Sequence, residues 1–145
     1  MSNATGPLST IVRDGEVVPL ALSNVKVYRG AAAAVVAGTG YGLPLVTASY
    51  VSQIFVGIFE ETYDNSAGSA GGYFTTIRRK GCVLFGQTGS TIAAASIGVK
   101  VYFTDDHTVS LAGSGSAICA GTVAAIDANG AVWVDIENAA GGIGT

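Results

Sequence analysis

The chain has 145 residues, a formal net charge of -3 at pH 7, and only 12% charged residues. This length fits one domain with a real core, and the slightly acidic balance excludes the basic footprint that nucleic-acid binding calls for. With 21 glycines and many alanines, the surface must be built largely from small residues, which suits close packing against another protein.

The two ends are expected to differ from the middle. Residues 1–20 mix prolines and glycines with polar residues, so we expect an extended arm, and residues 139–145 (AAGGIGT) a flexible tail. The arm has no basic segment followed by an apolar one, and no apolar run reaches the ~18 residues of a membrane span. We therefore expect a single β domain over 21–138, made in the cytoplasm and without a membrane partner.

Between the ends, β-type signals dominate. Short runs rich in β-branched or aromatic residues are each bounded by Gly, Asn, Asp or Ser. These runs are 24–30, 43–48, 52–61, 72–79, 81–87, 99–103, 108–111, 117–126 and 131–137. Their spacing predicts an all-β barrel or sandwich rather than a parallel sheet alternating with helices.

Helix signals are few. The Ala-rich run 31–36 is ambiguous, because alanine favours a helix whereas the valine pair that ends it does not. Residues 90–100 can form one or two turns after a Ser/Thr start, so we expect at most one short helix. The Ser, Gly and Asn stretch 62–72 is interpreted as a long surface loop.

One short motif occurs twice. VKVY stands at 25–28 and again at 99–102, and each copy is followed by a glycine inside an apolar strand, Gly57 and Gly121. Two interpretations stay open: an internal structural repeat, or the chance recurrence of a good amphipathic strand.

Two polar stretches indicate hairpin turns. The pair Asn129-Gly130 between two apolar runs predicts a tight turn with positive φ angles. The only histidine, His107, follows Asp105 and Asp106 between VKVYF and TVSL, where a hairpin turn is expected, with one of the aspartates bonded to the turn backbone.

The same residues argue against an enzyme. A metal site needs three or four converging ligands, and a triad needs a positioned nucleophile and base. One histidine, adjacent aspartates and two separated cysteines do not supply them, so we expect no cofactor and no metal. Cys82 and Cys119 lie in apolar runs and are interpreted as small buried thiols rather than a disulfide.

The stretch from residue 50 to 137 resembles the head decoration (cement) proteins of tailed bacteriophages. The resemblance rests on a glycine-containing strand and on a pattern of Gly and β-branched residues. The matching positions are Gly98, Val101, Tyr102, Val109, Gly121, Gly130, Val132 and Val134. The chain departs from the pattern at Cys119-Ala120 and in the Ala-rich run 31–36.

The resemblance implies a small β-barrel or β-tulip-like domain that binds the outside of an expanded capsid as an oligomer, often a trimer. The partner would be the major capsid protein and the location the virion surface. Candidate contacts come from the arm, from the acidic loop and from the basic run RRK. They are Leu8, Ile11, Val12, Arg13, Asp64, Arg78, Arg79 and Lys80.

Other functions share these features. A carbohydrate-binding or host-adhesion module would also be all-β and Gly-rich, and exposed aromatic residues in a groove would mark it. Another virion structural subunit is the third alternative. For the aromatic residues on the expected strands, the sequence favours roles as core or interface anchors.

Overall fold

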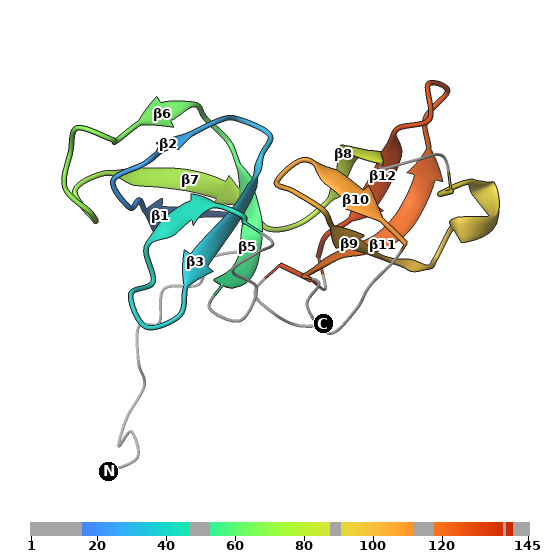
Figure 1. Ribbon diagram of the computed structural model, residues 1–145, viewed down its shortest axis with the longest axis horizontal. Coiled ribbons are helices and arrows are strands. Elements are labelled where there is room, and N and C mark those ends of the chain that lie inside the picture. The colour runs from blue at the N-terminus through green and yellow to red at the C-terminus, as the bar shows by residue number, and fades with distance from the viewer. Residues whose placement is uncertain (1–15, 47–52, 88–90, 112–117, 138, 141–145) are drawn as a thin grey trace, which may run out of the picture.

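The computed structural model describes residues 16–46, 53–87, 91–111, 118–137 and 139–140. Figure 1 shows these residues as two β units side by side, with strands β1 to β7 in one and β8 to β12 in the other. The candidate contacts Leu8, Ile11, Val12 and Arg13 lie outside the described residues.

The first unit is a five-stranded sheet with a small ribbon beside it. Its strand order is β1-β7-β5-β3-β4, and β2 pairs with β6. The strands are β1 (Val17–Ala21), β2 (Lys26–Val27), β3 (Ala32–Val36), β4 (Gly42–Pro44), β5 (Gln53–Phe59), β6 (Tyr63–Asp64) and β7 (Phe74–Arg78). A parallel bridge between Leu22 and Gly42 brings the two edges of the sheet together.

The second unit is a closed five-stranded barrel. Its strand order is β10-β8-β12-β11-β9, with β10 returning to β8 in parallel. The strands are β8 (Cys82–Gln87), β9 (Lys100–Phe103), β10 (Thr108–Ser110), β11 (Cys119–Ile126) and β12 (Val132–Asp135). The only helical element among the described residues is a 3-10 turn, Ala94–Ser96. The expected all-β class, with a small barrel and at most one short helix, is confirmed.

The alanine run is a strand because it lies between two cores. Ala33 belongs to the core of the first unit, with Phe59 and Ile77, whereas Ala32 and Ala34 belong to a larger core shared with the barrel. Side chains alternate across a strand, so β3 must be small and apolar on both faces. Burial on both faces outweighs the helix preference of alanine.

The boundaries of the arm and the tail differ from those expected. Val17–Leu20 belong to β1, in which Val18 and Leu20 pack against the first core while β7 pairs alongside. Ala139 and Ala140 are buried in the shared core rather than in a free tail. The stretch expected to be a loop contains β6, whose backbone pairs with β2.

Two local expectations also need correction. Cys119 is buried but Cys82 is exposed, because β8 turns it to the outer face; both are free thiols. The Asn129-Gly130 turn exists, but only Gly130 has a positive φ, of 88°. Gly130 donates its N–H to Asp127 O, and Asp127 N–H bonds Ala131 O, so Asn129 keeps an ordinary backbone conformation.

Candidate interaction surface

The His107 segment is a turn, as expected. Asp105, Asp106 and His107 join β9 to β10, and Asp105 Oδ1 accepts the His107 backbone N–H at 2.9 Å. The His107 Nδ1 lies 2.8 Å from Asp106 Oδ1, and this contact raises the pKa of His107. One ligand atom from each residue lies within 4.8 Å of the other two. The Asp105 carboxylate thus caps the turn backbone, and the Asp106 carboxylate holds the imidazole ring.

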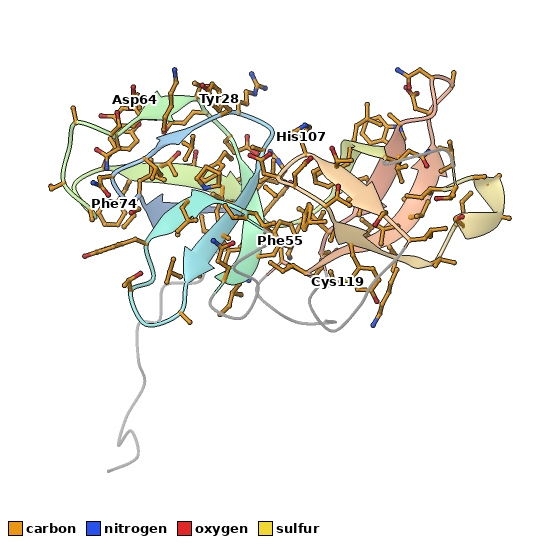
Figure 2. All side chains as sticks on the ribbon, viewed as in Figure 1. Tyr28, Phe55, Asp64, Phe74, His107 and Cys119 are labelled. Carbon is orange, nitrogen blue, oxygen red and sulfur yellow. The ribbon has the colours of Figure 1, made fainter. Side chains whose placement is uncertain are left out.

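This turn also connects the two units. The Ala32 N–H on β3 donates to the Asp106 carbonyl at 2.7 Å. Figure 2 shows His107 at the upper side of the junction, where the units meet. The polar residues at this position therefore form part of the junction between the two units.

The basic run Arg78, Arg79 and Lys80 divides into two roles. Arg78 binds two carboxylates: its Nη1 lies 2.6 Å from Glu16 Oε1, and its Nε lies 2.7 Å from Glu60 Oε1. The Glu60 hydrogen bond and charge, followed by those of Glu16, raise the pKa of Arg78. Arg78 on β7 therefore links Glu16, which precedes β1, to Glu60, which follows β5.

Arg79 and Lys80 lie instead in the linker that leads to β8. Together with Glu137 and Ala140 they line an open pocket of about 170 Å³. The Arg79 backbone N–H donates to Glu16 O at 2.8 Å, which fixes the start of the linker. Arg79 and Lys80 therefore border an open pocket beside the linker, whereas Arg78 is held by two carboxylates.

Asp64 stands on a different element, the β2–β6 ribbon. Its side chain is exposed and accepts hydrogen bonds from the backbone N–H and the hydroxyl of Ser66, which lower the pKa of Asp64. Lys26 pairs opposite it across the ribbon, and the Lys26 ammonium lies 5.1 Å from the Tyr28 ring centre. Asp64 thus initiates the loop after β6 and borders an exposed Lys-Tyr pair.

Several exposed apolar side chains on or beside strands were not singled out as contacts from the sequence. Phe74 on β7 is 64% exposed and Tyr28 beside the ribbon is 56% exposed. Leu84 and Trp133 are cross-strand partners on β8 and β12 and are 42% and 37% exposed. Figure 2 shows Phe74 and Tyr28 on the first unit, away from Phe55 at the centre.

The alternation of side chains along a strand is the sequence feature that could in part have identified Phe74 as exposed. Phe74 falls on the same face of β7 as Thr76, a polar residue, and opposite to the buried Thr75 and Ile77. The sequence shows the alternation but not which face meets the core. Large apolar groups on the outer face of a rigid strand are typical anchors of protein interfaces.

In the described part of the chain, no helix has the length and apolar character needed to cross a membrane. Comparison of the chain with protein-family models, with curated proteins and with solved structures finds no match.

Proposed function

We propose that the chain is a capsid decoration protein, which binds the outer surface of an expanded bacteriophage head as an oligomer and stabilises it. The observation that carries the proposal is Phe74, an aromatic residue that is 64% exposed on a strand. Complete burial of an exposed Phe side chain contributes about 1.5–3 kcal/mol, so burying the exposed part of Phe74 against a partner contributes about 1–2 kcal/mol. The resemblance to decoration proteins supplies the partner, the major capsid protein, and the trimeric state.

Composition supports a role in contact rather than chemistry. Charged residues make up 12% of the chain, and an interface poor in charge avoids the cost of desolvating ions. The basic groups at the unit junction, Arg79 and Lys80, and the ribbon residue Asp64 would contribute at the rim of the contact, as would the arm.

Stabilisation would follow from linkage. A ligand that binds only the assembled, expanded shell stabilises it by about 2.7 kcal/mol per site when its free concentration is 100 times Kd. Summed over the sites of a shell, this becomes a large stabilisation of the expanded state.

The test is binding of the full chain to expanded heads that lack decoration, measured by co-sedimentation and by electron microscopy. We expect bound density on the outside of the shell and a higher rupture temperature. Phe74→Ser should weaken binding at least tenfold, whereas Thr76→Ser, on the same face of the same strand, should not. Absence of bound protein at saturating concentration would reject the proposal.

A carbohydrate-binding or host-adhesion role is the second candidate, since Tyr28 and Phe74 are exposed and aromatic rings stack on sugars. An immobilised-glycan screen separates the two: specific glycan binding that Tyr28→Ala or Phe74→Ala abolishes would favour this role.

A further inference from the structure

The two units have the same strand order. The ribbon strands β2 and β6 are left out of this comparison. The other five strands of the first unit lie side by side in the order β1-β7-β5-β3-β4, which is the first, fifth, fourth, second and third strand along the chain. The barrel reads the same way, β8-β12-β11-β9-β10. Each unit also brings its first and third strands together in parallel, through Leu22 and Gly42 in one and through β8 and β10 in the other.

The registers agree around the whole circuit. Arg78 on β7 pairs with Val17 on one side and with Ile58 on the other. In the barrel, Asp135 on β12 pairs in the same way with Cys82 and with Thr122. The next pairings match as well: Ala32 with Ile58 and Lys100 with Thr122, then Ala34 with Leu43 and Tyr102 with Ser110.

The circuit also closes consistently. Leu22 is bridged to Gly42, and at the equivalent place Gln87 pairs with Val109. This makes Leu22 equivalent to Gln87, which agrees with the equivalence of Val17 to Cys82 on β1 and β8. A shift of one residue in any strand would have broken the agreement and turned side chains to the wrong face.

Both units carry the same irregularity at the same place. The ladder between the second and fourth strands has a bulge next to Gly57, opposite Ala33, and next to Gly121, opposite Val101. Both glycines have positive φ, 152° and 136°. At each, a backbone carbonyl of the last strand, Arg78 or Asp135, occupies the space of a Cβ.

The entry to the second strand is also repeated. Gly30 and Gly98 have φ of 89° and 87°. Gly30 N–H donates to Phe59 O at 2.9 Å, and Gly98 N–H donates to Val123 O at 2.8 Å. The return bonds, Phe59 N–H to Ala31 O and Val123 N–H to Val99 O, are both 3.0 Å long.

We infer that the chain is an internal duplication of one five-stranded unit. Gly57 and Gly121 occupy equivalent positions in the two copies, as do Gly30 and Gly98. The repeated VKVY motif does not mark the duplication. Val99–Tyr102 corresponds to Ala31–Ala34 on β3, whereas the first VKVY lies at the ribbon strand β2. The glycines that follow each VKVY, in contrast, do correspond.

The units differ where their surroundings differ. Ala32, Ala34 and Ile58 face the shared core, and their counterparts are Lys100, Tyr102 and Thr122, which are exposed or half-buried. The first unit has apolar residues here because the barrel packs against this face of β3 and β5. The described residues do not cover the equivalent face of β9 and β11 in this way, so more polar residues are expected there. The ribbon is an addition to the first unit; at the site of β6 the second unit has the tight turn from Asp127 to Ala131.

Nuclear magnetic resonance of the full chain tests the repeat. In antiparallel ladders, residues outside the hydrogen-bonded pairs bring their Hα atoms close together. Strong Hα–Hα contacts are expected between Pro19 and Thr76 and, at the equivalent place, between Leu84 and Trp133. A register offset by one residue in either unit would overturn the inference.

A substitution scan of the full chain, read out by thermal stability, gives a second test. Tolerance at each position of the first unit should correlate with tolerance at its counterpart, with Gly57 and Gly121 both intolerant of alanine. A better correlation after aligning residues 25–28 with 99–102, or no correlation in either alignment, would contradict the duplication.

Discussion

The rings of Phe55 and Phe103 meet edge to face, with their centroids 4.8 Å apart. Phe55 comes from β5 of the first unit and Phe103 from β9 of the barrel, and both are almost fully buried. Phe103 makes a second edge contact with Phe85, so the three rings form a continuous link from one unit into the other. These buried ring contacts join the two units, as does the backbone hydrogen bond from Ala32 to Asp106.

Phe55→Ala is expected to destabilise the chain by about 3–5 kcal/mol, because it removes a buried ring and leaves a cavity between the units. Phe74→Ala is the matched control, since this ring is exposed, and it should change stability by less than about 0.5 kcal/mol. Urea denaturation measures both. Equal effects would mean that the ring contact does not join the units.

Gly121→Ala should cost about 2–5 kcal/mol. The residue has a φ of 136°, and its Cβ would meet the Asp135 carbonyl on β12, which belongs to the ladder and cannot move away. Gly98→Ala separates the two causes, because Gly98 has a φ of 87° but no heavy atom within 4 Å of the added Cβ. We expect about 1–2 kcal/mol there. A cost at Gly98 as large as that at Gly121 would assign the whole effect to φ.

Asp106→Asn should lower the pKa of His107. The Asp106 hydrogen bond is the largest cause that raises this pKa above 6.5. A raised pKa in the folded state adds stability that is fully present below the unfolded pKa and is lost as pH rises through the folded value. The side chain is 73% exposed, so the effect on unfolding is under about 1 kcal/mol. Because there is one histidine, its ring resonance reports the titration without overlap; an unchanged midpoint would contradict the assignment.

Asn65→Ala should loosen the loop between β6 and β7. The buried Asn65 amide donates to Ser23 O at 3.0 Å and to Ser69 O at 3.2 Å, which closes the loop against the first unit. Leaving those carbonyls unpaired costs about 1–3 kcal/mol. Hydrogen exchange at Gly68, whose N–H bonds Asn65 O, should accelerate. Asn24→Ala, on the exposed turn nearby, is the control and should leave that exchange rate unchanged.

Local chemistry determined much of this fold. Runs rich in β-branched and aromatic residues placed the strands around Phe55, Phe85, Val101 and Val134, and the glycine and aspartate signals placed the turns at His107 and Gly130, because these signals depend on neighbouring residues alone. The sequence did not show that one ligand atom each from Asp105, Asp106 and His107 would lie within 4.8 Å of the other two, because adjacent aspartates were expected to point to opposite faces of a strand. Strand β1 was missed since its proline and flanking glycine resemble a coil, and only its pairing with β7 makes it a strand.

Long-range packing decided the rest. The sequence by itself determined that the chain is all-β, with a weakly charged surface and turns at known positions. Only the tertiary structure decided that β3 is buried on both faces, that Phe74 and Trp133 point outward, and that two stretches without similar sequence form the same unit. The physical reason is that burial and register depend on partners many residues away, and different side chains fill the same pair of β units equally well.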